Sequence, residues 1–133
     1  MEPHNIVLAE NSLAKAEQAL KDGHINLETS LSLAQNRAYY AVFYTVLALG
    51  YLDDFITSKH HQLMGWFNKK YIYEDKVFSH SIVKIYTTLM RKRETFDYDV
   101  TQNPIKEDVI KDLQDAETFI TTLKPYIIER ISK

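Results

Sequence analysis

The sequence contains no cysteine, and only three glycines and three prolines occur among its 133 residues. A chain without cysteine has no disulfide, no thiolate metal site and no cysteine nucleophile, which fits a reducing compartment. No apolar run approaches the roughly 20 residues that a membrane-spanning helix needs, and residues 1–11 have no basic cluster ahead of an apolar run, as a secretory signal would. We therefore expect a cytoplasmic protein with no membrane-inserted segment.

The common signatures of enzyme sites are also absent. The chain has no glycine-rich phosphate loop, no nucleophile elbow and no His-Glu-x-x-His pair. No two of the five histidines stand four residues apart, the spacing that would place both imidazoles on one face of a helix as metal ligands. The sequence thus predicts neither a metal site nor a bound cofactor.

Charge is small in total but unevenly placed. The chain carries a net charge of −2, yet residues 59–93 contain eight basic residues against two acidic ones. Such an asymmetry can form a local positive surface, the kind that binds phosphate backbones. It can equally be the ordinary solvated face of a helix, and the sequence leaves both interpretations open.

Apolar residues recur at steps of three and four along most of the chain, the period of amphipathic helices. The length, with 45% apolar and 26% charged residues, suits one globular domain over residues 1–133. We predict an all-α fold, an antiparallel up-and-down bundle of about five helices, punctuated by glycine and proline at its joints. The expected helices cover residues 5–22, 27–50 and 58–73, then residues from 79 or 81 past 96, and residues from 104 onward.

Local signals set the expected ends of these helices. Gly23 marks the end of the first helix, Ser58 caps the third, and Pro104 opens the last at its first turn. Pro125 falls on the apolar stripe of the last helix and predicts a kink or an early end near Leu123. The second helix is apolar on most sides, which places it at the centre of the bundle.

Two arginines stand where the pattern is otherwise apolar. Arg93 occupies a stripe position of the fourth helix, and a guanidinium keeps its charge when buried, so it needs a carboxylate or carbonyls around it. Asp97 follows four residues later, at the spacing of an ion pair along a helix. Arg37 flanks the second helix. The two arginines fit a buried structural network or a cleft that binds phosphate bidentately, and both interpretations stay open.

Tyrosine is abundant, with nine in the chain. Tyr39, Tyr40, Tyr44 and Tyr51 recur at helical spacing on the second helix, and such stripe positions favour burial in the core. Exposed rings beside positive charge would instead stack unpaired bases, as in sites for single-stranded nucleic acid.

Three segments carry a resemblance to a known family. The first is residues 36–43, Asn-Arg-Ala-Tyr-Tyr-Ala-Val-Phe. The second is His60 with Phe67 seven residues later, and the third is residues 93–99, Arg-Glu-Thr-Phe-Asp-Tyr-Asp. With the closing segment 116–120, they resemble the HEPN domains of bacteria and archaea, in particular the small stand-alone branch. The resemblance covers nearly the whole chain.

The resemblance implies a helical bundle that pairs as a homodimer and associates with a minimal nucleotidyltransferase encoded as a separate partner. Many HEPN proteins are metal-independent ribonucleases and toxins. Their cleaving motif is an arginine followed four to six residues later by a histidine, and the motifs of two protomers meet at the dimer interface. There the arginine steadies phosphate charge and the histidine takes part in attack by a ribose hydroxyl.

This sequence departs from that motif, because no histidine follows Arg93. The residue five positions along is Tyr98, and a tyrosine with an ordinary pKa near 10 is a poor general base at neutral pH. His60 is the candidate imidazole from another helix. In some pairs of HEPN protein and nucleotidyltransferase, a tyrosine after the motif arginine receives a nucleotide from the partner, and Tyr98 is the matching residue here.

The leading hypothesis is a HEPN-type protein that binds RNA or nucleotide and works with a nucleotidyltransferase, as in toxin–antitoxin pairs. The first alternative is a metal-independent endoribonuclease toxin, and the second is a non-catalytic interaction bundle. The candidate catalytic residues are Arg93, His60 and Tyr98, and the candidate residues for RNA or nucleotide binding are Asn36, Arg37, Tyr40, Arg93 and Asp97.

Overall fold

The computed structural model describes residues 2–99 and 101–133, and within these ranges it contains five α-helices and no strand. The predicted all-α bundle is thus confirmed. None of the described helices is long and apolar enough to cross a membrane. The helices are α1 (Pro3–Ile25), α2 (Leu31–Leu52), α3 (His60–Phe67), α4 (His80–Tyr98) and α5 (Lys106–Ser132), with a 3₁₀ turn η1 (Asn26–Glu28) and a π-helical segment η2 (Asn68–Glu74).

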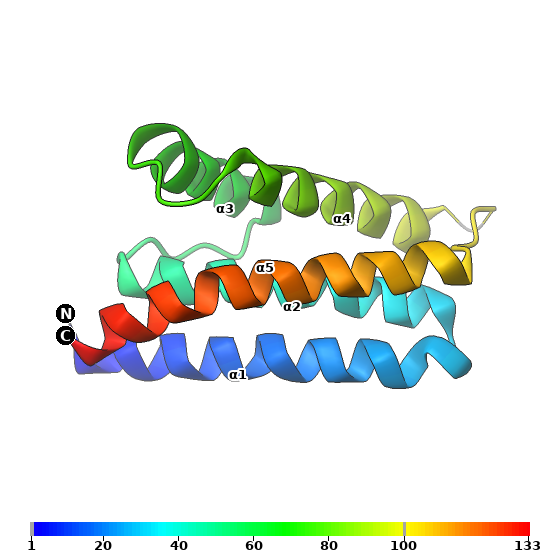
Figure 1. The fold of residues 1–133 in the computed structure, drawn as a ribbon, viewed down its shortest axis with the longest axis horizontal. Helices are drawn as coiled ribbons and strands as arrows, with labels where there is room; N and C mark the ends of the chain where they lie inside the picture. The colour runs from blue at the N-terminus through cyan, green and yellow to red at the C-terminus, as the bar shows by residue number, and fades with distance from the viewer. Residues whose placement is uncertain (1, 100) are drawn as a thin grey trace.

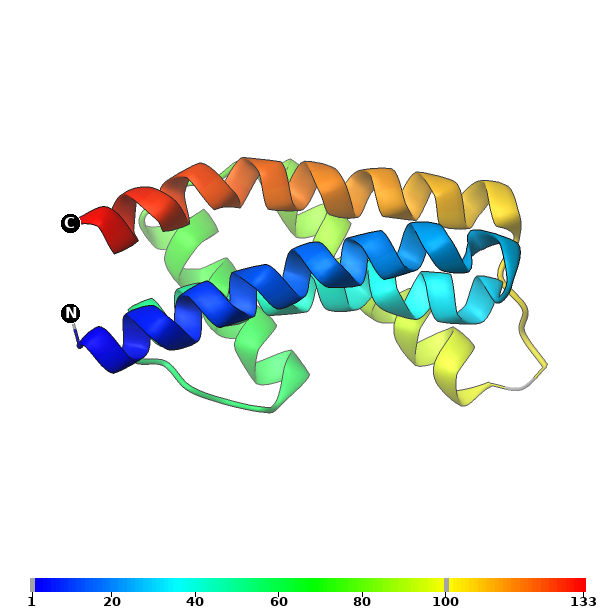
Figure 2. The same cartoon turned by 90° about the horizontal axis from the view of Figure 1, so that it is seen from below.

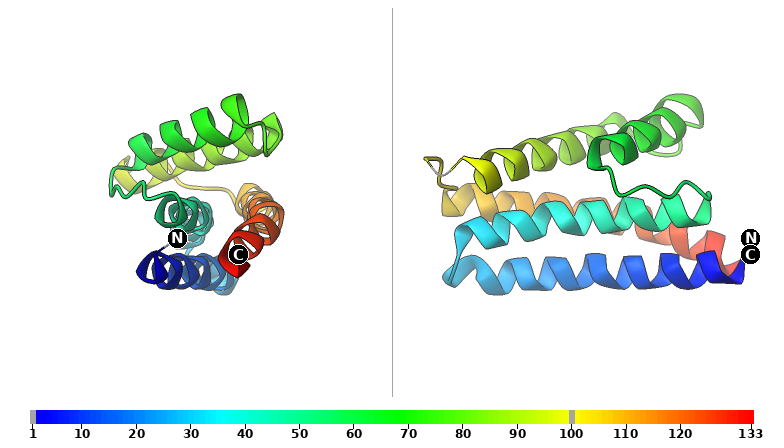
Figure 3. Two further views of the ribbon diagram at one scale, coloured as in Figure 1. Left: turned by 90° about the vertical axis from the view of Figure 1, so that its left-hand side faces the viewer. Right: turned by 180° about the vertical axis from the view of Figure 1, so that it is seen from behind.

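Helix α2 lies at the centre of the bundle. In the end-on view of Figure 3, α1 lies below α2, α5 lies beside α2, and the layer of α3 and α4 lies above them. The long helices α1, α2, α4 and α5 alternate in direction, and the two chain ends meet at the same end of the bundle (Figure 1). From below, α1 and α5 run side by side, and α2 lies behind α1 (Figure 2). The central position predicted for the second helix is confirmed.

Small residues allow α1 and α2 to approach closely. Gly23 was expected to end the first helix, but α1 continues to Ile25. A Cβ atom on Gly23 would lie 2.5 Å from the Leu113 side chain of α5 and 3.5 Å from the Ala34 carbonyl of α2. The glycine therefore serves interhelical packing, and the prediction of a stop was wrong. The buried small residues of the two helices are Ala9, Ser12, Ala16, Ala19 and Gly23 on α1 and Ala34, Ala38, Ala41, Thr45, Ala48 and Gly50 on α2.

Other predicted helix ends also differ from the structure. The third helix begins at His60 with Lys59 as its N-cap, so Ser58 does not cap it. Helix α5 begins at Lys106, two residues after Pro104, which therefore precedes the helix instead of opening it. For α4, the expected start is confirmed, because Ser79 occupies the N-cap position.

Pro125 lies inside α5, which continues to Ser132. The early end predicted near Leu123 is therefore wrong. Proline has no N–H for the carbonyl of Thr121 four residues earlier, and the helix tolerates this loss where its C-terminal turns bend toward α1 (Figure 1). Packing of the buried side chains Phe119, Leu123 and Ile127 holds the helix on both sides of the proline.

A cluster of charged side chains joins the end of α2 to η2 and α5. The Asp53 carboxylate, with a side chain only 6% exposed, pairs with Arg130 Nη1 at 2.7 Å and Lys70 Nζ at 3.3 Å. It also accepts a hydrogen bond from the Tyr71 hydroxyl, to which Arg130 Nη1 donates at 2.9 Å. These contacts fix the end of η2 and therefore the place of the α3 helix that precedes it.

Two glycines inside helices provide a matched test of how closely other atoms approach the helix backbone. Gly50 lies inside α2, and a Cβ atom there would stand 2.6 Å from the backbone oxygen of Phe55. We expect Gly50→Ala to lower the free energy of unfolding by about 1–3 kcal/mol, the usual cost of overpacking. Gly65 lies inside α3, and a Cβ atom there would meet no other atom within 4 Å. Gly65→Ala should therefore raise the free energy of unfolding by about 0.5–1 kcal/mol.

Urea unfolding followed by circular dichroism measures both changes. A Gly50→Ala variant as stable as the wild type would show that the segment after α2 yields without cost, and would contradict the close approach at Gly50. The position of Gly65 inside α3 also corrects the expectation that every glycine stands at a helix end.

Candidate functional site

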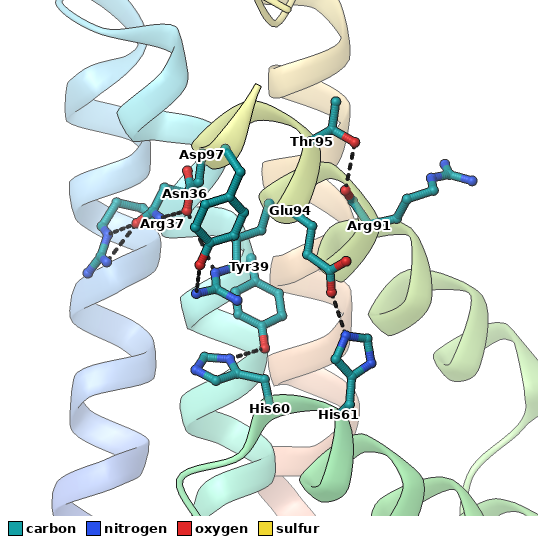
Figure 4. Close-up of polar contacts among 11 residues, drawn as sticks. Asn36, Arg37, Tyr39, His60, His61, Arg91, Glu94, Thr95 and Asp97 are labelled. Carbon is teal, nitrogen blue, oxygen red and sulfur yellow. Dashed lines mark hydrogen bonds and ion pairs between the residues drawn. The ribbon is translucent and has the colours of Figure 1, made fainter. Parts of the chain in front are cut away.

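The candidate site lies where the first half of α2 meets the last turns of α4, beside the start of α3 (Figure 4). On α4, Tyr86, Leu89 and Arg93 follow one another at steps of three and four, so the stripe that buries Tyr86 and Leu89 against the core also directs Arg93 toward α2. The contacts described below connect all of the predicted site residues in one set: Asn36, Arg37, Tyr40, His60, Arg93, Asp97 and Tyr98.

The Arg93 guanidinium lies among tyrosine rings, and its side chain is only 14% exposed. Its central carbon stands 5.4 Å from the ring centroid of Tyr39, 5.6 Å from that of Tyr40 and 5.7 Å from that of Tyr98. A cation over a ring face gains about 0.5–2 kcal/mol, more where water is excluded. Three rings therefore help to hold a permanent charge at the edge of the core.

One carboxylate faces this guanidinium. Asp97 Oδ2 lies 3.6 Å from Arg93 Nε, which confirms the predicted pairing along the helix. The separation exceeds that of a hydrogen bond, and Arg93 Nε is buried without a hydrogen-bond partner. On its other edge, Arg93 Nη2 donates to the Tyr98 hydroxyl at 3.1 Å. The guanidinium thus keeps hydrogen-bonding capacity that the protein does not use.

Asn36 links the two arginines of the site. Its Nδ2 donates to Asp97 Oδ2 at 2.8 Å, and its Oδ1 accepts from Arg37 Nε at 3.1 Å and Arg37 Nη2 at 2.8 Å. The Arg37 guanidinium lies 4.8 Å from the ring centroid of Tyr40. The asparagine amide, which is both donor and acceptor, therefore joins two cations that would otherwise repel each other.

His60 is held by aromatic side chains. Its ring stacks on Phe43 with centroids 4.3 Å apart and planes 14° apart, and its Nδ1 shares a 2.6 Å hydrogen bond with the hydroxyl of buried Tyr39. Burial, then the charges of Arg93 and His61, lowers the pKa of His60, while Glu94 acts in the opposite direction. The imidazole is therefore mainly neutral at pH 7. Burial raises the pKa of Tyr39, so its hydroxyl keeps its proton.

A second imidazole near the site was missed by sequence reasoning. His61 Nε2 lies 2.6 Å from Glu94 Oε1, and both side chains are exposed to solvent. The pair joins α3 to α4 across 33 residues of sequence, a separation at which neither motif nor periodicity relates two residues. The sequence offers one indication of this pair: His61 directly follows the candidate residue His60, and Glu94 directly follows the candidate residue Arg93.

The groups gathered at the site are guanidinium and phenol groups, the carboxylates of Asp97 and Glu94, and the imidazoles of His60 and His61. Among residues 2–99 and 101–133, no group of three or more histidine, aspartate or glutamate side chains converges to hold a metal ion. Tyr98, the last residue of α4, is 70% exposed and presents its hydroxyl to solvent beside Arg93. A planar guanidinium and exposed hydroxyls suit recognition of a phosphate group.

Two relatives are similar to this chain over most of its length. A protein of Thermotoga maritima named "UPF0332 protein" is 31% identical over 114 residues, which cover 85% of this chain and 86% of the relative. The "Putative toxin MJ0142" of Methanocaldococcus jannaschii is 28% identical over 123 residues, which cover 91% of this chain and 82% of the relative.

The family model for the HEPN domain matches residues 9–126. This range takes in α2, α3, α4 and most of α5, and with them every residue of the candidate site from Asn36 to Tyr98. The match spans most of the chain and agrees with the resemblance carried by the three short segments, so the chain belongs to the HEPN domain family.

Proposed function

We propose that this HEPN protein binds RNA or nucleotide at the cluster around Arg93, as one member of a toxin–antitoxin pair. The observation that carries the proposal is the state of Arg93. Its charge is partly buried among three tyrosines, yet its Nε has no hydrogen-bond partner. A buried donor without a partner costs about 1–3 kcal/mol. Because Nε is closed to solvent, a phosphate would meet the guanidinium at its Nη2 edge, beside the exposed Tyr98 hydroxyl.

The charges around Arg93 favour an anion. Arg37 and Arg93 share the single carboxylate of Asp97 through Asn36, so the network keeps a positive excess. An arginine fork matches two oxygens of one phosphate, and such charge-assisted bonds are about twice as strong as neutral ones. The Asp53 network also sets one carboxylate against two cations, but there Arg130 reaches the carboxylate at 2.7 Å, whereas Arg93 Nε stands 3.6 Å from Asp97 without a hydrogen bond.

Tyr98 supports the proposed nucleotidyltransferase partner. Its hydroxyl is exposed and accepts a hydrogen bond from Arg93 Nη2. An exposed phenol beside a cation suits transfer of a nucleotide to it from a nucleoside triphosphate: the phenol oxygen forms the new bond to phosphorus, pyrophosphate leaves, and the cation holds the charged phosphate. The name of the Methanocaldococcus jannaschii relative includes the word toxin, in keeping with a toxin–antitoxin role. The proposal also includes a homodimer, which the family implies, and a cytoplasmic location, because a chain without cysteine fits a reducing compartment.

A second candidate function is metal-independent cleavage of RNA, and His60 is the observation that favours it. Its lowered pKa keeps the imidazole neutral and able to accept a proton at pH 7. Nε2 is free to accept the proton of a ribose hydroxyl in the tautomer in which Nδ1 carries the ring proton and donates it to the Tyr39 hydroxyl oxygen. Arg93 would then steady the charge that develops on the phosphate, in the role that the family gives to its motif arginine.

The first prediction from the proposal concerns binding. Arg93→Ala should weaken binding of labelled single-stranded RNA in EDTA by about 10–100-fold, the equivalent of the roughly 1.5–3 kcal/mol of a charged hydrogen bond. Arg91→Ala is the matched control, because Arg91 is an exposed arginine two residues away on the same helix. The control should bind RNA as the wild type does. If wild-type protein shows no RNA affinity and Arg93→Ala fails to fold, Arg93 is structural and the proposal falls.

The second prediction concerns cleavage, read from the same samples. If the ribonuclease candidate is correct, the wild type cuts RNA in EDTA, Arg93→Ala abolishes the cutting and His60→Gln reduces it. Cleavage that persists in both variants comes from a contaminating nuclease. Binding without any cleavage leaves the binding protein as the function and removes the ribonuclease.

The third prediction concerns pH. His60 should titrate below the ordinary histidine value of about 6.5 in an NMR titration of imidazole resonances. Since its pKa is lower in the folded state, the folded protein holds fewer protons, and its stability falls as pH drops below about 6.5. His60→Gln should therefore lose less stability than the wild type between pH 7 and 5. A His60 pKa at or above 6.5 would contradict the burial described here.

A further inference from the structure

We infer that the groove between α1 and α2 binds the bases of single-stranded RNA that leave the Arg93 cluster, with Tyr44 and Tyr51, which line it, as stacking surfaces. The inference rests on the proposed RNA binding and extends it, because it names the form of RNA and the direction in which the strand runs. It assigns a role to aromatic side chains of α2 that are only partly buried.

The groove lies between α1 and α2. It has a volume of about 390 Å³ and opens between the facing sides of the two helices. Ser12 Oγ of α1 donates to the Tyr44 carbonyl of α2 at 2.7 Å and forms part of its floor. The lining residues are Leu8, Asn11, Ser12 and Lys15 from α1 and Tyr44, Leu47 and Tyr51 from α2.

The structure divides the tyrosines of α2 into two groups. Tyr39 is fully buried, so it belongs to the core. Tyr40, Tyr44 and Tyr51 are only partly buried and follow one another at steps of four and seven, which places them on one stripe of the helix. The rings of Tyr40 and Tyr44 lie 5.7 Å apart. Tyr40 also touches the Arg93 cluster, so the stripe begins at the proposed phosphate site.

Positive charge accompanies the stripe. Arg37 lies over the Tyr40 ring at 4.8 Å, and Lys15 lies over the Tyr44 ring at 5.8 Å. No aspartate or glutamate is among the residues that line the groove. Partly exposed aromatic rings beside cations, without carboxylates, are the surface on which bases of a single strand stack while its phosphates meet the cations.

The dimensions suit a short strand. Tyr40 and Tyr51 are eleven residues apart, so they stand about 16 Å apart along a helix that rises about 1.5 Å per residue. A stacked strand advances about 3.4 Å per nucleotide, so the stripe would accommodate about four or five nucleotides beyond the phosphate at Arg93. Oligonucleotide length therefore distinguishes the two parts of the surface.

The experiment compares fluorescein-labelled oligoadenylates of two and eight nucleotides, binding to wild type, Tyr44→Leu and Lys15→Gln in EDTA. We expect the wild type to bind the octamer more tightly than the dimer. Tyr44→Leu should weaken octamer binding by about 5–100-fold, since one base stacked on an aromatic ring is worth about 1–3 kcal/mol. Dimer binding should stay unchanged. Lys15→Gln should weaken octamer binding less and flatten its dependence on salt.

Tyr73→Leu is the matched control, because Tyr73 is exposed on η2, where its ring lies beside His80 and away from the groove. It should bind both oligonucleotides as the wild type does. Light scattering of each variant reports the oligomeric state. If Tyr44→Leu leaves octamer affinity unchanged, or lowers it only by changing the oligomeric state, the groove is not an RNA surface and the inference fails. If the wild type binds neither oligonucleotide, the proposed function itself fails.

Discussion

The burial of α2 is the constraint on which the rest of the structure depends. Small residues on α1 and α2 let the two helices approach closely enough that α5 and the layer of α3 and α4 also reach α2. A helix covered on three sides has one side left, and here that side carries the partly exposed tyrosines and Arg37. Close packing of alanine and glycine thus determines which part of α2 meets solvent.

Two arginines at opposite ends of the bundle differ in how fully the protein uses their hydrogen-bonding groups. Arg130 pairs with Asp53 at 2.7 Å and also donates to Tyr71 and to the Leu52 carbonyl. Arg93 has its carboxylate at 3.6 Å and a buried Nε without a hydrogen bond. Arg130 is therefore fully engaged within the fold, whereas Arg93 keeps a donor that the fold does not use.

Sequence periodicity predicted the helices because burial in a bundle repeats every three to four residues. The local signals were less reliable: Gly23 does not end α1 but lies close to Leu113 of α5 and Ala34 of α2, and of the two outcomes predicted at Pro125 the early end does not occur. Within the site, the Arg93–Asp97 pair could be predicted since both residues lie on one helix. The bonds of Tyr39 to His60 and of His61 to Glu94 join different helices, and no spacing along the chain indicates them.

Tyr39 gives the site its geometry. The same buried ring lies 5.4 Å from the Arg93 guanidinium and 5.6 Å from the His60 ring, and its hydroxyl binds His60 Nδ1. The imidazole and the guanidinium therefore keep a fixed relation, although one comes from the start of α3 and the other from the end of α4. In the family motif that relation comes from spacing along one helix. Here a core tyrosine supplies it between two helices, so loss of the motif histidine does not by itself separate an imidazole from the arginine.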